Sequence, residues 1–172
     1  MTAGERLCYD VTFDHRSLLK QSPFGLVFQN GPGAGERATV SGIERRQIDT
    51  VRSNPFGKRS SVRDRFDEIR LHLRFGNASP GNAPAGTTFD PVVRAYDDGV
   101  AFRYELPVST GAFTVTGEKT GFTFAEDAPA WGGEWSNCGE CRYPATTLAL
   151  LPASKMCLPL LVRTRGATVA RA

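Results

Sequence analysis

Hydrophobic and polar residues alternate along several stretches of the chain, which is the pattern of strands with one buried face. The clearest stretch is Asp67–Phe75, where Ile69, Leu71 and Leu73 alternate with charged residues and a histidine. An earlier stretch, Leu7–Phe13, alternates in the same way. A period of two places side chains of one kind on one face of a sheet. Both stretches are therefore predicted to be half-buried β-strands.

Other extended segments are shorter or less regular. Residues 38–51 carry apolar side chains at mixed spacing and are predicted to form a strand. Further strand candidates are residues 22–28, 113–116, 121–124, 146–151 and 158–164. One alternative is a short helix over Val62–Ile69, where apolar residues have helical spacing. Many short strands without long amphipathic helices favour an antiparallel sandwich over a βαβ fold.

A β-hairpin is predicted over Val92–Leu106, because two alternating runs flank the dipeptide Asp98–Gly99. Aspartate followed by glycine readily adopts the positive φ angles of a type I′ turn. A two-residue loop also sets which residues of the two strands face each other. With this loop, Ala95 lies opposite Phe102 and one face of the hairpin is apolar.

The same register brings two like charges together on the other face of the hairpin. Arg94 lies directly opposite Arg103, and like charges in that position destabilise a sheet unless an anion lies between them. A carboxylate is therefore expected close by, from Glu68, Glu105 or another acidic residue. The pattern favours a structural ion-pair network, and the alternative is a contact to a partner domain or to an anionic group.

Length and composition place the chain among ordinary globular proteins. Its 172 residues are 40% hydrophobic and 23% charged, which suits one domain over residues 1–172, complete or truncated. The net charge of +3 comes from basic and acidic residues that alternate along the chain, so binding to nucleic acid is not expected. No apolar stretch reaches the roughly 20 residues of a membrane span. Residues 1–6 lack the basic start and apolar core of a secretory signal peptide.

The chain has four cysteines, Cys8, Cys138, Cys141 and Cys157, and only one pair has a suggestive spacing. Cys138 and Cys141 form a CxxC motif. A structural zinc site usually takes two such close pairs, and a thioredoxin-like redox site needs the motif at the start of a helix in a βαβ unit. Neither context is present, so the cysteines are interpreted as thiols without a special role. A zinc site and a redox pair are the alternatives.

The segment Tyr96–Tyr104 reads Tyr-Asp-Asp-Gly-Val-Ala-Phe-Arg-Tyr. It resembles the most recognisable stretch of the N-terminal domain of family 97 glycoside hydrolases, a group of bacterial α-glucosidases and α-galactosidases. Further segments are similar to this family in the same order. They are Leu7–Val11 with Ser22–Leu26, Gly57 with Val62–Glu68, Gly139–Tyr143, and Leu158–Leu160. The resemblance therefore covers nearly the whole chain.

The resemblance implies both a fold and a role. The implied fold is all-β, an antiparallel β-super-sandwich that packs on a catalytic (β/α)8 barrel in complete enzymes and helps to form the pocket for α-linked glycosides. The family's catalytic carboxylates belong to the barrel, so this chain is expected to be non-catalytic. The family also implies a periplasmic or secreted location and, in complete members, calcium. Arg171 occupies the place of a calcium-binding acid, so no metal residue is assigned.

Four residues are predicted to face the sugar pocket. They are Trp131, Trp135, Glu140 and Tyr143. Aromatic rings stack on sugar faces, and carboxylates accept hydrogen bonds from sugar hydroxyls. The alternative for each aromatic is a place in the core or in an interface. For the whole chain, the alternatives are an independent carbohydrate-binding module, or a small zinc or redox module that uses the CxxC motif.

Overall fold

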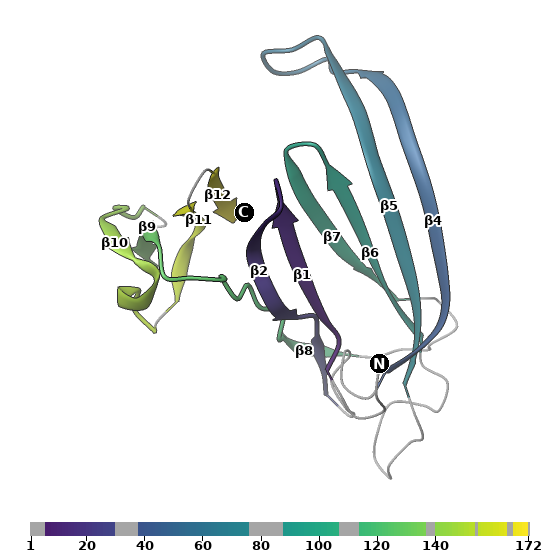
Figure 1. Cartoon of the computed structure of the whole chain (residues 1–172), viewed down its shortest axis with the longest axis horizontal. Coiled ribbons are helices and arrows are strands. Elements are labelled where there is room, and N and C mark those ends of the chain that lie inside the picture. The colour runs from purple at the N-terminus through teal and green to yellow at the C-terminus, as the bar shows by residue number, and fades with distance from the viewer. Residues whose placement is uncertain are drawn as a thin grey trace. The chain divides into compact units, whose positions relative to one another are not determined.

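The chain is built almost entirely from β-strands in a computed structural model (Figure 1). The structure describes residues 6–29, 38–75, 88–106, 114–136, 140–153, 155–164 and 167–171. The elements are β1 (Cys8–Phe13), β2 (Arg16–Pro23), β3 (Leu26–Phe28), β4 (Ala38–Ser53), β5 (Ser61–Phe75), β6 (Thr88–Tyr96), β7 (Gly99–Glu105), β8 (Val115–Glu118), β9 (Pro129–Glu134), β10 (Ala145–Thr147), the 3-10 helix η2 (Leu148–Leu150), β11 (Met156–Thr164) and β12 (Ala167–Arg171). The prediction of an all-β fold is confirmed. In the part of the chain that is described, no helix is long and apolar enough to cross a membrane.

The chain forms two compact units. The first contains Met1–Cys8 and Pro23–Gly121, and the second contains Tyr9–Ser22 and Phe122–Ala172. The first unit holds the four-stranded sheet β4-β5-β6-β7 and the two-stranded sheet β3-β8. The second holds the four-stranded sheet β10-β9-β11-β12 and most of the hairpin β1-β2. Each unit therefore has a four-stranded antiparallel sheet of its own.

Strands β4 and β5 are the longest of the chain and pair with each other along nearly their whole length. A β-bulge between Val40 and Gly42 changes which side chains of β4 point to which face. Val40 pairs with Leu73 before the bulge, and Ile43 pairs with Leu71 after it, so residues of both parities reach the same face. This change of phase explains the mixed apolar spacing in the sequence of this strand.

One face of the first sheet carries the core of the first unit. Leu73 and Phe89 have no exposed surface, and they pack with Leu26 and Phe28 of β3. The ring of Tyr104 lies against this cluster, with its centroid 4.9 Å from that of Phe89. Full burial of such a side chain is worth about 1.5–3 kcal/mol. With this face of the sheet buried, the alternate residues of the same strands point to the opposite face.

The strand predicted at Asp67–Phe75 is confirmed, and it starts earlier than the prediction, because β5 begins at Ser61. The alternative of a helix over Val62–Ile69 is therefore wrong. Every residue of that segment pairs with β4, and this cross-strand pairing outweighs the helical spacing of three apolar residues. The strand predicted over residues 38–51 is confirmed as β4.

The predicted hairpin is present as β6 and β7, but its turn differs from the prediction. Asp97 and Asp98 form the turn, and Gly99 is the first residue of β7, opposite Tyr96. The type I′ turn over Asp98 and Gly99 is therefore wrong. The register moves by two residues, so each side chain stays on its predicted face but has a different partner.

The two hairpin arginines consequently do not face each other. Arg94 lies opposite Ala101, and Arg103 lies opposite Val92. Like charges placed directly opposite each other destabilise an antiparallel pair, and the observed register avoids this contact. The predicted pairing of Arg94 with Arg103 is wrong for this reason.

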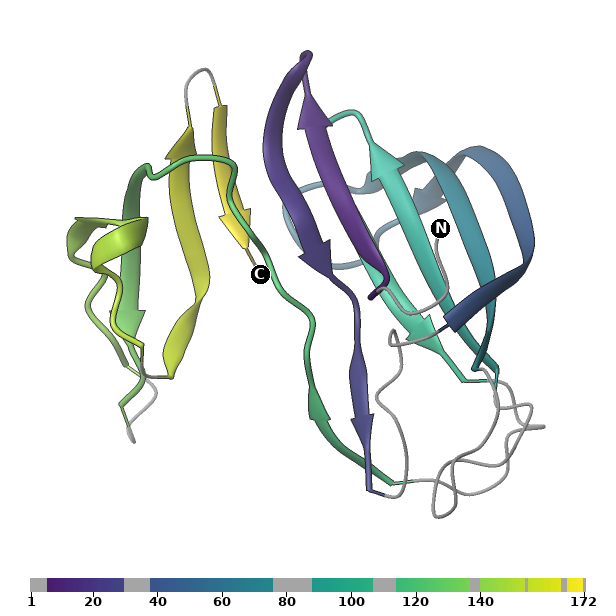
Figure 2. The ribbon, with the colours of Figure 1, turned by 60° about the horizontal axis from the view of Figure 1, so that its bottom comes forward.

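The four-stranded sheet of the second unit has shorter strands than that of the first (Figure 2), and its core side chains are smaller. Strand β9 lies between β10 and β11, and β12 pairs with the other edge of β11. The core consists of Ala128, Ala130, Leu160 and Val162. A Cβ atom added to Gly132 would lie 2.5 Å from the terminal methyl carbon of Met156 and 3.0 Å from a methyl carbon of Leu160. The absence of a side chain at Gly132 therefore leaves room for the side chains of the neighbouring strand β11.

A disulfide joins Cys141 to Cys157 of β11. The interpretation of these two cysteines as thiols without a special role is therefore wrong. Cys157 lies opposite Gly133, where an added Cβ atom would lie only 2.5 Å from the backbone oxygen of Arg142, so the glycine makes room for the bonded segment. Cys141 cannot serve a CxxC zinc or redox pair while it is bonded to Cys157, and Cys138 lies outside the described residues.

The remaining strand predictions are met in part. Residues 158–164 lie within β11, and residues 113–116 overlap β8, with Phe113 outside the described residues. Residues 146–151 end β10 but continue as η2, and residues 121–124 contribute only an isolated bridge. The second unit is thus the less regular one.

Candidate functional site

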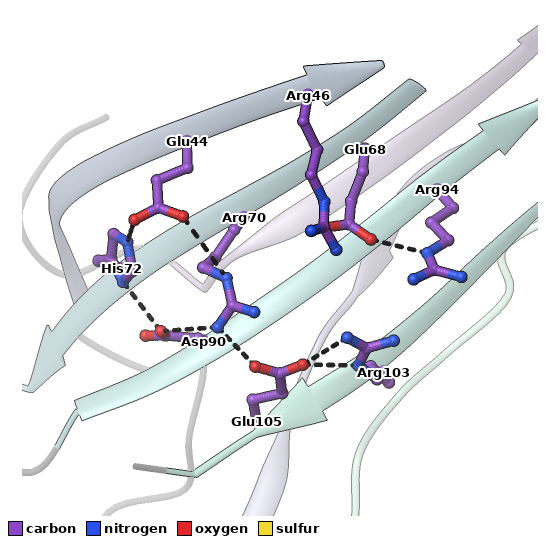
Figure 3. Close-up of polar contacts among 9 residues, drawn as sticks. All are labelled: Glu44, Arg46, Glu68, Arg70, His72, Asp90, Arg94, Arg103 and Glu105. Carbon is purple, nitrogen blue, oxygen red and sulfur yellow. Dashed lines mark hydrogen bonds and ion pairs between the residues drawn. The ribbon is translucent and has the colours of Figure 1, made fainter. Parts of the chain in front are cut away.

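Nine titratable side chains lie on the face of the first sheet opposite its core, and we call this set the charged face (Figure 3). They are Glu44 and Arg46 of β4, Glu68, Arg70 and His72 of β5, Asp90 and Arg94 of β6, and Arg103 and Glu105 of β7. The strand register brings them together, because every second residue of a strand points to the same face. All four strands of the sheet contribute to the charged face.

One cluster on the charged face is a carboxylate between two arginines. Glu68 is 5% exposed, and its two oxygens accept hydrogen bonds from Nε of Arg46 and Nε of Arg94, each at 2.7 Å. Both arginines lie directly across from it on the neighbouring strands. The guanidinium of Arg94 also lies over the ring of Phe66, with Cζ 4.2 Å from the centroid. The buried carboxylate is stabilised because each oxygen has a cationic donor.

His72 lies between two acids in a second cluster. Its Nε2 is 3.0 Å from Oε1 of Glu44, and its Nδ1 is 2.8 Å from Oδ2 of Asp90. The hydrogen bond to Glu44, and then that to Asp90, raises the pKa of His72 above its ordinary value, although partial burial opposes the shift. A protonated imidazole donates from both nitrogens, so the charged form satisfies both acids.

The same cluster continues from Asp90 to the edge strand β7. Nη1 of Arg70 lies 3.6 Å from Oδ2 of Asp90 and 2.5 Å from Oε2 of Glu105. The other oxygen of Glu105 accepts a hydrogen bond from Nε of Arg103 at 2.7 Å. The carboxylate predicted beside Arg103 is therefore Glu105, and the one beside the other hairpin arginine is Glu68. The structural ion-pair network expected from the sequence is confirmed.

The two glutamates in the middle of the charged face are held in their ionised forms. Arg46 is the main cause that lowers the pKa of Glu68, and Arg103 is the main cause that lowers the pKa of Glu105, although burial opposes both shifts. The proton donor of a glycoside hydrolase needs the opposite, a raised pKa that keeps it protonated near neutral pH. The geometry therefore suits ion pairing and not proton transfer.

The charged face offers little room for a small molecule. A hollow beside Glu44, Arg46 and Glu68 has a volume of about 100 Å³, whereas ligand pockets are roughly 300–1,000 Å³. A larger hollow of about 670 Å³ also touches Arg46 and Glu68, but it is lined mainly by residues that alternate with those of the charged face, such as Ile69 and Val93. Among the residues that the structure describes, no three His, Cys, Asp or Glu side chains are grouped so as to hold a metal ion. The calcium implied by the resemblance also lacks a fitting ligand at Arg171, which is a cation. The charged face thus has the character of a surface and not of a cavity.

One acceptor of the charged face is unused. Oδ1 of Asp90 is buried and has no hydrogen-bond partner among the described residues. The sequence did not point to this residue, because it directly precedes Pro91 and lacks the clear alternation of β5. Glu44 and Arg46 were missed as well, because the bulge at Gly42 hides the alternation of β4. Alternation after the bulge was the signal that could have found them.

The residues predicted to face a sugar pocket all lie in the second unit. They are Trp131, Trp135, Glu140 and Tyr143. Trp131 of β9 is half-buried, and the guanidinium of Arg163 lies over its ring, 5.6 Å from the centroid. This cation–π contact gives the ring a partner within the protein. It corresponds to the alternative of a structural aromatic.

The other three predicted residues are exposed. Trp135 is 54% exposed and Tyr143 is 40% exposed, and the hydroxyl of Tyr143 donates a hydrogen bond to the backbone oxygen of Leu158 at 3.1 Å. The hydroxyl of Ser136 donates to the backbone oxygen of Glu140 at 2.7 Å. The structure therefore brings the segments that carry Trp135 and Glu140 side by side, while sugar binding by these residues stays a prediction.

Comparisons with known proteins agree with this architecture. A family model described as Glycosyl-hydrolase 97 N-terminal matches residues 1–171. A probable retaining alpha-galactosidase of Streptomyces bingchenggensis is 33% identical over 160 residues, and a retaining alpha-galactosidase of Bacteroides thetaiotaomicron is 28% identical over 177 residues. These matches cover 93% and 94% of this chain but 24% of each relative. The chain thus spans about a quarter of the length of these relatives.

Solved structures show the same fold. The crystal structure of a beta-arabinopyranosidase matches with a TM-score of 0.75 and 26% identity, over 93% of this chain and 26% of that one. A glycoside hydrolase family 97 enzyme from Pseudoalteromonas sp. strain K8, in complex with acarbose, matches with a TM-score of 0.73 and 21% identity, over 93% of this chain and 24% of that one. The second likeness supports the fold alone.

Proposed function

This chain belongs to the glycosyl-hydrolase 97 N-terminal family, and on that premise we propose that it is the non-catalytic domain that packs on the (β/α)8 barrel of such an enzyme and helps to form its sugar pocket. The observation that carries the proposal is a family match over residues 1–171 in a chain that spans about a quarter of its relatives' length. The remaining length of an enzyme of this kind holds the barrel and its catalytic carboxylates.

The chemistry of the charged face supports a non-catalytic role. Glu68 and Glu105 each have two arginine partners, and their lowered pKa values make them poor proton donors near neutral pH. Such a network ties the strands of the sheet together, because Glu68 links β5 to β4 and β6, and Glu105 of β7 reaches Arg70 of β5. The substrate of the complete enzyme is an α-linked glycoside, as the names of the two alpha-galactosidase relatives suggest. Calcium, where the complete enzyme binds it, takes its ligands elsewhere than from Arg171.

Trp135 and Tyr143 are the residues of this chain that contribute to the sugar pocket. Their exposure supports this role, because an aromatic ring must be accessible to stack on a sugar. An independent carbohydrate-binding module is the second candidate, and the same exposure favours it. Calorimetric titration of the 172-residue chain with α-linked oligosaccharides separates the two: an incomplete pocket gives no saturation, whereas saturable binding that Trp135→Ala abolishes identifies an independent module.

The disulfide between Cys141 and Cys157 supports export of the protein to the periplasm or the medium. Disulfides persist in oxidising compartments and are rare in the cytosol. Alkylation of free thiols in cell fractions, followed by mass measurement, tests the location. A chain found only in the cytosolic fraction with four alkylated cysteines would contradict export.

A domain exchange tests the proposed packing on a barrel. The quarter of the Bacteroides thetaiotaomicron alpha-galactosidase that this chain matches is replaced by the chain itself, and hydrolysis of a nitrophenyl α-galactoside is measured. The chimera is expected to be active, and the relative without that quarter is expected to be inactive. An inactive chimera beside an active shortened relative would show that this chain does not serve as the packing domain.

A further inference from the structure

The β4–β5 hairpin has a part that no other described strand pairs with. We call residues 49–65 the arm. Strand β6 pairs with β5 only from Asp67 onward, so the arm is a two-stranded ribbon, and Figure 1 shows it extending past the β6–β7 hairpin. Two-stranded ribbons are marginally stable on their own in water. The arm therefore needs stabilising contacts beyond those between its own two strands.

The arm is a well-defined ribbon with a closed turn. Its strands remain paired up to Ser53 and Ser61. The backbone N–H of Asn54 donates to the oxygen of Ser60 at 2.9 Å, and its side-chain amide donates to the oxygen of Arg59 at 3.2 Å. Gly57 has a φ of 99°, in the region that favours glycine. These contacts define the backbone of the turn.

The most exposed aromatic side chain of the described residues lies at this turn. Phe56 is 83% exposed, and Val51 on the adjacent β4 is 70% exposed. A phenylalanine on a defined turn, with nearly all of its surface in water, leaves a large apolar side chain uncovered by the described residues. Such a side chain is typical of an anchor that enters a pocket of a neighbouring protein surface.

The arm also carries the excess positive charge of the chain. Its sequence contains five basic and two acidic residues, a net charge of +3, which equals the net charge of the whole chain. Arg63 is bound by both oxygens of Asp49, and Arg65 is bound by Asp97. The three other basic residues, all exposed and near the turn, are Arg52, Lys58 and Arg59. We call the turn with these three residues the tip of the arm, and it presents an exposed aromatic ring beside three cations.

We propose that the arm docks on the catalytic barrel of the same enzyme, with Phe56 in an apolar socket and with carboxylates of the barrel surface around Arg52, Lys58 and Arg59. This inference rests on the proposed function. The relatives hold about three quarters of their length outside the match, so a neighbouring domain is at hand. Proteins that bind nucleic acid use rows of basic and aromatic residues, and one aromatic ring with three cations is a small surface by comparison.

A photo-crosslinker placed at position 56 of the chimera tests the contact directly. A benzophenone-bearing phenylalanine in place of Phe56 is expected to crosslink to a peptide of the alpha-galactosidase part, which mass spectrometry identifies. The same crosslinker in place of Phe13, which is 48% exposed on β1, is the matched control. A crosslink from position 13 as strong as that from position 56 would contradict a specific docking contact.

Two sets of variants measure the energetic role of the tip. Phe56→Ala, and separately Lys58→Glu with Arg59→Glu, are expected to shorten the half-life of chimera activity on heating about tenfold, as for a central interface residue. The controls are Leu150→Ala, at a side chain that is 75% exposed, and Lys20→Glu with Lys155→Glu, at two exposed lysines. The controls are expected to leave the half-life unchanged.

The outcomes separate the arm from the proposed function. An active chimera without a crosslink from position 56, and with unchanged half-lives for the tip variants, overturns the docking of the arm and leaves the packing domain intact. An inactive chimera beside an active shortened relative overturns both. Binding of the isolated chain to vesicles of phosphatidylserine and phosphatidylcholine, or to a single-stranded RNA, that is lost in Lys58→Glu with Arg59→Glu overturns the barrel as the partner.

Discussion

The two four-stranded sheets of this chain are stabilised in different ways. The sheet β4-β5-β6-β7 buries large side chains such as Leu73 and Phe89 on one face and carries ion pairs across all four strands on the other. The sheet β10-β9-β11-β12 has a core of two alanines, a leucine and a valine, and a disulfide that ties β11 to the Cys141 segment. The first relies on packing and register, and the second on a covalent link and close backbone approach.

This difference follows from the lengths of the strands in the two sheets. Long strands give the first sheet many cross-strand pairs, so ion pairs on one face and packed side chains on the other both favour one register. The short strands of the second unit cannot do this, and small residues such as Gly132 and Gly133 replace bulky packing with close contact. A disulfide then removes freedom from the unfolded chain where the core is small. Each of the following substitutions changes one of these contributions.

The largest effect is expected from Phe89→Ala in the core of the first sheet. Phe89 has no exposed surface, and removal of a buried phenyl ring costs about 3–5 kcal/mol of unfolding free energy. Hydrogen exchange of the β5 and β6 amides measures the loss. Phe13→Ala, on the exposed side of β1, is the control. A loss of less than about 1 kcal/mol would show that this core does not carry the first unit.

The next largest effect is expected from removal of the disulfide by Cys141→Ser with Cys157→Ser. Closing a loop of this length contributes about 3 kcal/mol. Both tryptophans of the chain lie in the second unit, so tryptophan fluorescence during urea unfolding reports on that unit. Its midpoint is expected to fall, whereas Cys8→Ser, at an exposed free thiol, leaves it unchanged. Equal urea midpoints for both variants would show that the disulfide does not stabilise the second unit.

A smaller effect is expected from Glu68→Gln on the charged face. The variant keeps the shape of the side chain but removes the charge between Arg46 and Arg94, and because both arginines still reach water the cost is about 1–2 kcal/mol at neutral pH. The lowered pKa of Glu68 means that its contribution is present above the ordinary carboxyl pKa and disappears as the pH falls through the lowered value. Urea midpoints at pH 7 and below pH ~4 measure both claims, and Glu126→Gln, at an exposed acid, is the control. A difference that grows on acidification would contradict the ion pairing.

The smallest effect is expected from the pH dependence of His72. Its pKa is raised, mainly by Glu44, so its contribution is fully present below the ordinary value of about 6.5 and is lost as the pH rises through the folded-state pKa. The difference in urea midpoint between the wild type and His72→Gln should therefore be larger at pH 5.5 than at pH 9. NMR titration of the ring protons gives the pKa directly. A pKa below that of a free histidine would contradict the pairing with Glu44 and Asp90.

Much of the first sheet was predictable from the sequence, because its strands alternate. The polar side of β5 supplied three residues of the charged face. The two hairpin arginines predicted that carboxylates lie beside them, and Glu68 and Glu105 are these carboxylates. The register was not predictable, because Asp97–Asp98 and Asp98–Gly99 are both reasonable turns, and the sequence of the hairpin alone does not choose between them; the observed turn separates Arg94 from Arg103. The β-bulge at Val40 likewise hid the pattern of β4.

The second unit and the arm were less accessible to sequence reasoning. Cys157 is distant in sequence from the CxxC motif, and nothing local indicates that the fold places it beside Cys141. The net charge of +3 of the arm can be counted from the sequence. Only the structure shows that Asp49 and Asp97 bind two of its arginines and that the other basic residues lie near the turn beside Phe56.

The central claim is that this chain supports catalysis without performing it, and one assay tests it most directly. The pure 172-residue protein is incubated with a nitrophenyl α-galactoside, and release of nitrophenol is followed beside a buffer blank and the active chimera. The account predicts no release above the blank from the chain alone. Turnover by the chain alone that is abolished by Glu68→Gln or Glu105→Gln would contradict it.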